Sequence, residues 1–235
     1  MIYSGKKLPK TVFAIGLFLI VVVGIVFTAV GLIDYFIPAL VKSNLIDDKF
    51  AVACLQTSVK WSGFEWIIGI LFLLVSIYFL ATLHKNKKSI YGLFITSLVS
   101  IWAITLLIIP KIESYTQVPA IEFYESLKGK DCYIETINFH SYAQLFYTNK
   151  QPEQNPPAML SYIKNKEQEL SKSHYTGAIS FKVLSTDWLL IENIEKPAFF
   201  ISKINDAEDI EKHHPDLIEL NRKGGFVFYK RLPKQ

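Results

Sequence analysis

The distribution of apolar and charged positions divides the chain into two halves. Charged residues are sparse from Thr11 to Pro110 and dense from Lys111 onward. Three stretches of the first half are long and almost uncharged, at about residues 12–33, 64–83 and 90–109, with Pro110 closing the third. Because a bilayer core of roughly 30 Å requires about 20 apolar residues, each stretch predicts a transmembrane helix. We therefore expect a membrane region at 1–110 and a domain outside the bilayer at 111–235.

The positions of the lysines predict how this region is oriented. Lys6, Lys7 and Lys10 precede the first stretch, and residues 84–88 (HKNKK) form the turn between the second and third. Basic residues concentrate on the cytoplasmic side of membrane proteins, so this pattern predicts a cytoplasmic N-terminus. The loop at 42–61 and everything after Pro110 would then lie outside the cytoplasm. Glycines 16, 24 and 31 in the first stretch could form a small-residue surface for close helix packing.

The loop between the first two stretches is not featureless. Two mixed apolar segments, about 35–41 and 50–59, could each form a short helix on the outer membrane face. The polar groups nearest that surface could contact a phosphate-bearing lipid or a sugar; they are Asp47, Asp48, Lys60 and Glu65. A solvated loop is the simpler alternative.

The second half predicts a small α/β layer fold, because helix and strand signals alternate along it. Pro119 suits the first turn of a helix and Gly129 its left-handed end, and Ser141 with Gln144 resembles a capping box. The expected strands are 132–139, 179–184, 188–192 and 198–204, with a hairpin around Gly224-Gly225. The other expected helices start at Ala158 and at Asn205 or Asp206, and a polar loop fills 148–157.

The residue types and their spacing do not identify a reaction. The chain contains no phosphate-binding glycine loop, nucleophile elbow or zinc-protease motif, and its net charge of +4 forms no basic stripe for nucleic acid. His213 and His214 are adjacent, which favours a surface pair at a helix end over a metal site. Cys54 and Cys132 are too few for a disulfide framework; they could pair if the compartment oxidises, but a buried thiol is favoured for Cys132.

The order of the parts carries more information. Residues 111–117 (KIESYTQ) and 119–131 (PAIEFYESLKGKD) are followed by a strand and then by 141–147 (SYAQLFY). This arrangement resembles the C-terminal region of bacterial GT-C glycosyltransferases, in the group that contains aminoarabinose transferase and the protein O-mannosyltransferase-like enzymes. The resemblance covers nearly the whole chain and is strongest at 111–147 and 188–204.

The resemblance implies an enzyme of the bacterial cytoplasmic membrane that transfers a sugar from a polyprenyl-phosphate donor to a lipid or protein acceptor. Such enzymes carry an essential acidic residue in their first outer loop, and this chain has no counterpart of that loop. We therefore expect a C-terminal part that is inactive alone, with its catalytic residues unknown. No cofactor is identifiable, and a divalent metal in the complete enzyme stays open.

Two alternatives remain from the residues alone. Tyr142 and Tyr147 could stack on a sugar, although one or both could instead be core aromatics. A stand-alone, membrane-anchored binding module without catalysis is the second functional hypothesis. Neither the sugar, the acceptor nor the oligomeric state follows from the sequence.

Overall fold

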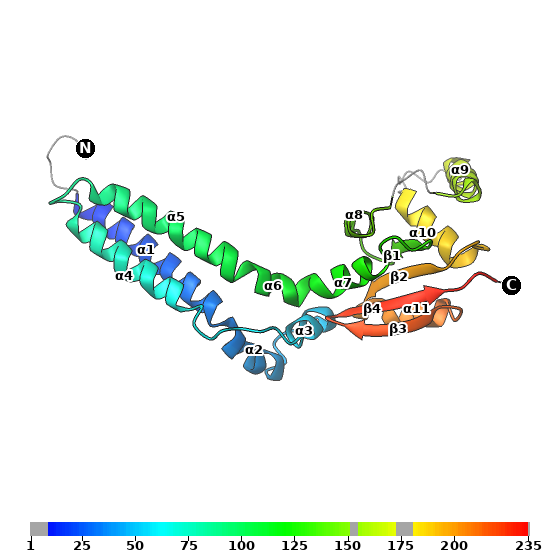
Figure 1. Ribbon diagram of the computed structural model, residues 1–235, viewed down its shortest axis with the longest axis horizontal. Coiled ribbons are helices and arrows are strands. Elements are labelled where there is room, and N and C mark those ends of the chain that lie inside the picture. The colour runs from blue at the N-terminus through cyan, green and yellow to red at the C-terminus, as the bar shows by residue number, and fades with distance from the viewer. Residues whose placement is uncertain (1–8, 151–154, 173–180, 235) are drawn as a thin grey trace. The chain divides into compact units, whose positions relative to one another are not determined.

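The computed structural model describes residues 9–150, 155–172 and 181–234 and contains two compact units (Figure 1). The first unit, here called the helical unit, consists of the chain up to Leu45 together with Ser58–Tyr115. The second, here called the sheet unit, combines Ile46–Thr57 with the chain from Thr116 onward. A short segment from the first half of the sequence therefore folds with the C-terminal half.

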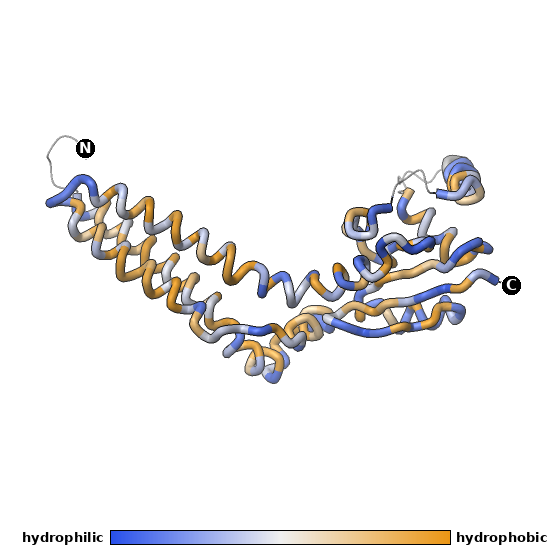
Figure 2. Tube along the Cα trace, viewed as in Figure 1, coloured by the Kyte–Doolittle hydropathy of each residue, from blue (hydrophilic) through white to orange (hydrophobic). Residues whose placement is uncertain are grey.

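The helical unit is built from apolar helices. They are α1 (Lys10–Gly31), α2 (Ile33–Lys42), α4 (Ile67–Thr82), α5 (Ser89–Leu107) and α6 (Ile109–Thr116). Among the described residues two helices are long and apolar enough to cross a membrane, Lys10–Gly31 and Ser89–Thr116, and Figure 2 shows their apolar character. The predicted middle span is an apolar helix of 16 residues, shorter than the sequence suggested.

Small residues bring α1 and α4 close together. Gly24 and Gly31 are buried, and a Cβ at Gly24 would stand only 2.2 Å from a side-chain carbon of Leu73. Gly69 on α4 faces Thr28 in the same way, at 2.2 Å from its hydroxyl oxygen. Close approach of this kind increases dispersion contact between helices whose neighbours are equally apolar. The predicted packing role is confirmed for Gly24 and Gly31.

The prediction that Pro110 ends the third apolar helix is wrong. The helix is interrupted at Ile108, whose φ of −107° departs from helical values, but α6 starts at the next residue. Pro110 is then the second residue of α6. A proline is tolerated there because its missing N–H would have no intrahelical partner in the first turn.

Polar groups connect the start of α4 with α6 inside the helical unit. Glu65 is buried and accepts hydrogen bonds from the N–H and hydroxyl of Ser62, each at 2.8 Å, and from the ammonium of Lys111. The indole N–H of Trp61 donates to the Tyr115 hydroxyl at 2.9 Å. The three bonds to Glu65 all involve its oxygen Oε1, whereas Oε2 is buried and has no hydrogen-bond partner among the described residues.

The sheet unit contains one mixed sheet of four strands in the order β1-β2-β4-β3. The strands are β1 (Tyr133–Thr136), β2 (Ala198–Lys203), β3 (Ile218–Lys223) and β4 (Phe226–Arg231), with β1 parallel to β2 and the other pairs antiparallel. The helices are α3 (Lys49–Leu55), α7 (Val118–Ser126), α8 (Ala143–Thr148), α9 (Pro157–Lys172), α10 (Phe181–Ile191), the 3-10 turn η3 (Ile204–Asp206) and α11 (Ala207–His213).

Helices cover both faces of this sheet because its central strands are apolar on both sides. Phe200, Val227 and Tyr229 belong to one core cluster, which α9, α10 and α11 complete. Their neighbours Ile201 and Phe228 belong to a second cluster on the opposite face, which α7 completes and against which Phe50 of α3 packs. The predicted α/β layer fold and the hairpin at Gly224-Gly225 are confirmed.

The segment 46–57 is held in the sheet unit by specific contacts. The rings of Phe50 and Phe226 meet edge to face at 5.1 Å, and the Cys54 thiol donates to the Gly224 carbonyl at 3.3 Å. Gly225 has a φ of +79°, and a Cβ there would lie 2.8 Å from the Phe50 ring. The predicted helix in this segment is present as α3, but it packs beside the β3–β4 turn as part of a domain core.

Helix α10 (Phe181–Ile191) lies where the sequence predicted two strands. The strands predicted at 179–184 and 188–192 are wrong, since the described part forms a single helix, α10. Its residues Leu184 and Trp188 lie one turn apart and are both buried. The run is rich in β-branched and aromatic residues, and burial in a helical layer outweighs that weak preference.

Candidate ligand-binding site

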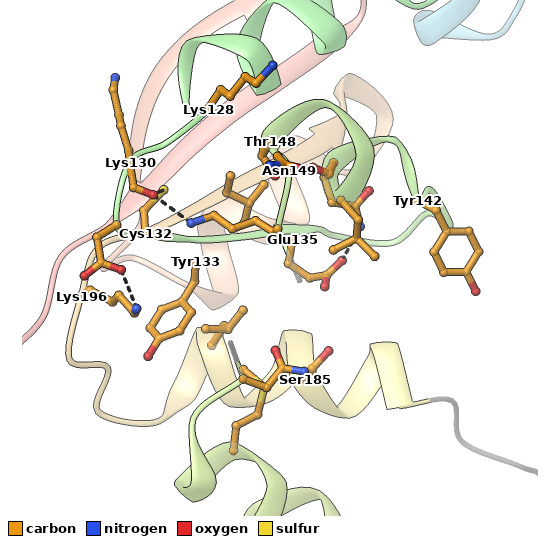
Figure 3. A pocket seen from close by; sticks show the side chains of 18 of the residues that line it. Lys128, Lys130, Cys132, Tyr133, Glu135, Tyr142, Thr148, Asn149, Ser185 and Lys196 are labelled. Atoms are coloured by element: carbon orange, nitrogen blue, oxygen red, sulfur yellow. Dashed lines mark hydrogen bonds and ion pairs between the residues drawn. The ribbon is translucent and has the colours of Figure 1, made fainter. Parts of the chain in front are cut away.

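The sheet unit contains a cavity of about 780 Å³ along the free edge of β1. It lies between α8 on one side of the strand and α9 and α10 on the other (Figure 3). The edge is available because the N–H groups of Tyr133 and Ile137 point the other way, to the carbonyls of Pro197, just before β2, and Ile201, within β2. A volume within about 300–1,000 Å³ is typical of small-molecule sites.

Glu135 projects from β1 into this cavity and is the central charged group of its floor. Its side chain is 14% exposed, and one oxygen, Oε1, accepts from the Thr136 N–H at 3.0 Å and the Gln144 amide at 3.1 Å. No described residue donates to its other oxygen. Burial raises the pKa of Glu135 above its usual value, because these hydrogen bonds only partly offset desolvation of the carboxylate.

Lys182, in the first turn of α10, connects this floor to the loop after β1. Its ammonium lies 3.7 Å from Oε1 of Glu135 and donates to the Thr136 hydroxyl and to the carbonyls of Phe139 at 3.0 Å and Ser141 at 3.2 Å. Burial lowers its pKa. With all its donors engaged, Lys182 positions the floor and is not free to bind a ligand.

Gln144 on α8 leaves one polar atom without a partner. The residue is 2% exposed, and its amide N–H₂ donates to Glu135, whereas its carbonyl oxygen is buried and accepts no hydrogen bond from any described residue. Reversing the amide would place two oxygens against each other, so the observed orientation is the favourable one. A buried acceptor without a donor costs free energy, and a bound donor would recover it.

The same residue corrects a sequence-based expectation. In a capping box Gln144 would bond back to the backbone N–H of Ser141. Here Ser141 accepts from the N–H of Ala143 at 3.1 Å, while the side chain of Gln144 turns to Glu135. The helix is present, but Gln144 belongs to the cavity instead of the cap.

Lysines surround the rim of the cavity. Its lining contains five lysines against two carboxylates, a formal excess of three positive charges (Lys128, Lys130, Lys150, Lys182 and Lys196 against Asp131 and Glu135). Lys196 pairs with Asp131 at 2.6 Å, and Lys150 donates to the carbonyl of Lys130 at 2.8 Å. The ammonium groups of Lys128 and Lys130 have no hydrogen-bond or ion-pair partner among the described residues. The rim therefore carries a local excess of positive charge.

A second hollow of about 1,120 Å³ runs along α10, from Lys182 to Ile191, and has a different character. Its charged groups are largely paired with each other: Arg231 with Asp216 at 2.7 Å, and His213 with Asp209 at 3.2 Å. Among the described residues no group of three or more His, Cys, Asp or Glu is arranged to hold a metal ion. His213 and His214 lie at the end of α11, as expected from the sequence.

The residues predicted to contact a ligand are not brought together. Asp48 is the N-cap of α3 and accepts from the Phe50 N–H at 2.9 Å and the Asn205 amide at 2.8 Å, and Asp47 beside it is exposed. Lys60 is an exposed residue of the helical unit. Tyr142 is 75% exposed and lines the cavity, whereas Tyr147 packs against the second core cluster and its ring also meets that of the exposed Phe146.

Sequence reasoning missed the groups that form the floor, Glu135, Gln144 and Lys182. Their spacing along the chain carries no motif, since they come from a strand and two helices. The available signal was a charged Glu inside an otherwise apolar strand, because a buried charge is costly unless neighbouring groups pair with it or hydrogen-bond to it. Both cysteines are free and buried, and burial raises the pKa of each thiol.

Comparison with protein-family models, with curated proteins and with solved structures finds no match to this chain. The functional argument therefore depends on the residues and on the geometry described above.

Proposed function

We propose that this chain is the C-terminal part of a GT-C-type glycosyltransferase, anchored in a bacterial cytoplasmic membrane by three helices with the sheet unit outside the cytoplasm. In this proposal the complete enzyme transfers a sugar from a polyprenyl-phosphate donor to a lipid or protein acceptor. The sheet unit contributes ligand binding, and the chemistry requires residues that this chain does not supply.

One observation carries the proposal. The two stretches that most resemble GT-C enzymes, 111–147 and 188–204, are far apart in sequence, yet both line the same cavity. Lys128, Glu135 and Gln144 come from the first, and Leu189 and Lys196 from the second. A shared surface is the expected reason for two separated stretches to keep a common pattern, because a ligand contacts both at once.

The fold supports the proposed number of membrane crossings. The chain leaves the sheet unit after Thr57, passes through α4 and α5, and returns to it at Thr116. A chain that leaves and re-enters a domain on one side of a membrane crosses an even number of times. Helices α4 and α5 pack against each other, and together they provide such a pair. Trp66 and Leu83 extend the helical backbone of α4 at its two ends.

The site itself supports binding more than catalysis. Glycosyl transfer needs a base positioned on the attacking hydroxyl and charge stabilisation at the leaving phosphate. Glu135 is the one carboxylate on the floor among the described residues, and its Oε1 is already hydrogen-bonded. This is why we assign the chemistry to another part of the enzyme.

A second candidate is a stand-alone anchored binding module. The observation that favours it is that all the described residues that line the cavity belong to the sheet unit, so the membrane helices contribute none of them. In that case the chain would present a ligand to a separate partner, and binding would occur without transfer.

Membranes from cells with and without the intact gene would test the first proposal. Each preparation is incubated with short-chain polyprenyl phosphates that carry radiolabelled mannose, glucose or aminoarabinose. We expect one sugar to move into lipid or protein only where the chain is present. Equal transfer in both preparations overturns the proposal. Binding of a donor to the purified chain, without any gene-dependent transfer, makes the anchored module the better account.

A further inference from the structure

We propose that the cavity beside β1 binds an anionic carbohydrate, with sugar hydroxyls at the Glu135–Gln144 floor and a phosphate or carboxylate at the lysine rim. This inference deepens the proposed function and rests on it for the place of such a ligand in a transfer reaction. The binding event itself is measurable without any transfer.

The floor of the cavity has hydrogen-bond acceptors that lack donors. Gln144 has a buried carbonyl oxygen without a donor, and one oxygen of Glu135 is unbonded among the described residues. A ligand that fills this space with hydroxyl groups would satisfy both acceptors. Thr148 and Ser185 add hydroxyls to the lining; each already donates to a backbone carbonyl, of Gln144 and Lys182 respectively, so each can accept a hydrogen bond from a ligand. A purely apolar ligand would leave the Gln144 carbonyl oxygen and the second Glu135 oxygen desolvated and unpaired, which is costly.

The rim of the cavity is positively charged, which favours a negatively charged ligand group. Lys128 and Lys130 lie in the turn after α7 at the outer edge of the cavity, where Figure 3 shows both side chains directed away from Glu135, and neither has a charged partner among the described residues. Asp131 is already occupied by Lys196. A phosphate or carboxylate at this position would form charge-assisted hydrogen bonds, which are roughly twice as strong as neutral ones. Floor and rim together select a molecule with hydroxyls at one end and an anion at the other.

The walls suit the apolar face of a sugar ring. Tyr133 and Tyr142 both line the cavity, and Figure 3 shows their rings on the two sides of the floor residue Glu135. The ring of Tyr133 is buried against Trp188 with the Lys196 ammonium over it, so Tyr142 is the ring that a sugar could stack on. Tyr142 is 75% exposed, so its ring is available without rearrangement. Aromatic rings with one polar end combine a flat apolar surface with a hydrogen-bonding group, as a sugar requires.

Binding of mannose 1-phosphate to the full chain in detergent or nanodiscs, measured by calorimetry or saturation-transfer NMR, would test the inference. Glucose 6-phosphate and glucuronate are parallel anionic probes, and mannose, inorganic phosphate and dodecyl phosphate are the comparison ligands. We expect an anionic sugar to bind at least about tenfold more tightly than mannose or inorganic phosphate, since each of these offers only half of the contacts.

Variants locate the site. Lys130→Gln should weaken binding of the anionic sugar about tenfold, whereas Lys212→Gln, a matched loss of charge on α11 outside the lining, should not change it. Gln144→Leu removes the unpaired acceptor and should weaken the sugar more than inorganic phosphate. If that variant fails to fold, Tyr142→Ala changes an exposed ring and should weaken binding with the fold intact.

The outcomes separate this inference from the proposed function. Absence of binding up to about 10 mM, equal affinity for inorganic phosphate, or tighter binding of dodecyl phosphate each overturns the carbohydrate assignment. If gene-dependent sugar transfer persists in the Lys130→Gln and Tyr142→Ala variants, the transferase proposal stands and the assignment of this cavity to the sugar is wrong. Sugar binding in the absence of any transfer overturns the transferase role and leaves the cavity assignment in place.

Discussion

The two units use the same side-chain types in opposite ways. In the helical unit Phe18 and Phe94 are 66% and 70% exposed, whereas in the sheet unit Phe200 and Val227 are completely buried. An exposed apolar surface as extensive as that of α1 and α5 requires a cover, because soluble domains rarely expose large apolar patches. The difference indicates that each unit is built for its own surroundings, which supports the proposed place of the helical unit in a bilayer.

The units also differ in what holds them together. The helical unit relies on close approach at small residues such as Gly24 and Gly69, as expected where apolar burial gives little advantage. The sheet unit relies on buried aromatic clusters on both faces of a sheet, the usual source of stability in water. Substitutions of one kind should therefore have very different effects in the two units.

The largest expected effect comes from removing a core ring. Phe200→Ala should destabilise the sheet unit by about 3–5 kcal/mol, because it leaves a cavity at a site with no exposed surface. The matched change Phe18→Ala on α1 should alter its stability by less than about 0.5 kcal/mol. Hydrogen exchange of the peptide covering β2, in the full chain in detergent, measures both. Comparable losses from the two variants would remove the distinction between the units.

A slightly smaller effect is expected at Arg231. This side chain is 1% exposed, and it donates to the carbonyls of Leu189 at 2.8 Å and Glu192 at 2.7 Å at the end of α10. Arg231→Met would leave these carbonyls and the Asp216 carboxylate without their partner, at a cost of about 3 kcal/mol.

The exposed pair of Arg222 with Glu219 is the control for that prediction, since Arg222→Met should cost less than about 1 kcal/mol. Thermal unfolding in detergent compares the two variants. If both arginine variants unfold together at the wild-type temperature, Arg231 does not hold the end of α10.

Phe50→Ala tests whether segment 46–57 belongs to the sheet unit. Its ring is partly buried against Phe226, and Lys203 lies 5.0 Å from its centre, so we expect a loss of about 1–2 kcal/mol from the sheet unit. Phe36→Ala, at an exposed position on α2, should leave the sheet unit unchanged. Exchange of the β4 peptide is the measurement. An unaltered rate in Phe50→Ala would mean that α3 contributes nothing to this domain.

The smallest effect concerns pH. Because the folded-state pKa of Glu135 is raised, the folded protein holds this proton more tightly than the unfolded chain. Glu135 therefore adds to stability as the pH falls through its pKa in the folded state, and this contribution is complete below its pKa in the unfolded chain, about 4.3. Relative to Glu135→Gln, the wild type should gain stability between pH 7 and pH 5.

Glu219 provides a control of opposite sign. Arg222 lowers the pKa of Glu219, so the stability from that pair is present above the unfolded pKa and is lost as pH falls through the folded value. Chemical unfolding at several pH values, in wild type and both glutamine variants, compares the slopes. A wild type that loses stability relative to Glu135→Gln on acidification contradicts the assigned burial of Glu135.

The sequence predicted those features that depend on local pattern. The apolar helices, the hairpin at Gly224-Gly225 and β2 follow from composition, turn residues and period. Helix α10 was misassigned because an apolar run of this length fits a strand or a helix, and only the burial of Leu184 and Trp188 one turn apart decides between them.

The candidate site was harder to predict from the sequence than the fold. Glu135, Gln144 and Lys182 meet only because a strand edge and two helices converge, and no spacing rule encodes this. The membership of α3 in the sheet unit likewise depends on Phe50 meeting Phe226, a contact between residues 176 positions apart. Of the predicted contact residues, Tyr142 lines the cavity and Tyr147 packs against the core, a difference that their residue type could not predict.

The central claim is that α4 and α5 cross the membrane as a pair, with segment 46–57 and the sheet unit on the same outer side. Single cysteines at Asp47, Asn86 and Asn155, in a background with Cys54→Ala and Cys132→Ala, test it by labelling intact cells with a membrane-impermeant thiol reagent. The account predicts labelling at Asp47→Cys and Asn155→Cys and protection at Asn86→Cys until the cells are opened. Labelling of Asn86→Cys in intact cells, or opposite results at Asp47→Cys and Asn155→Cys, would contradict it.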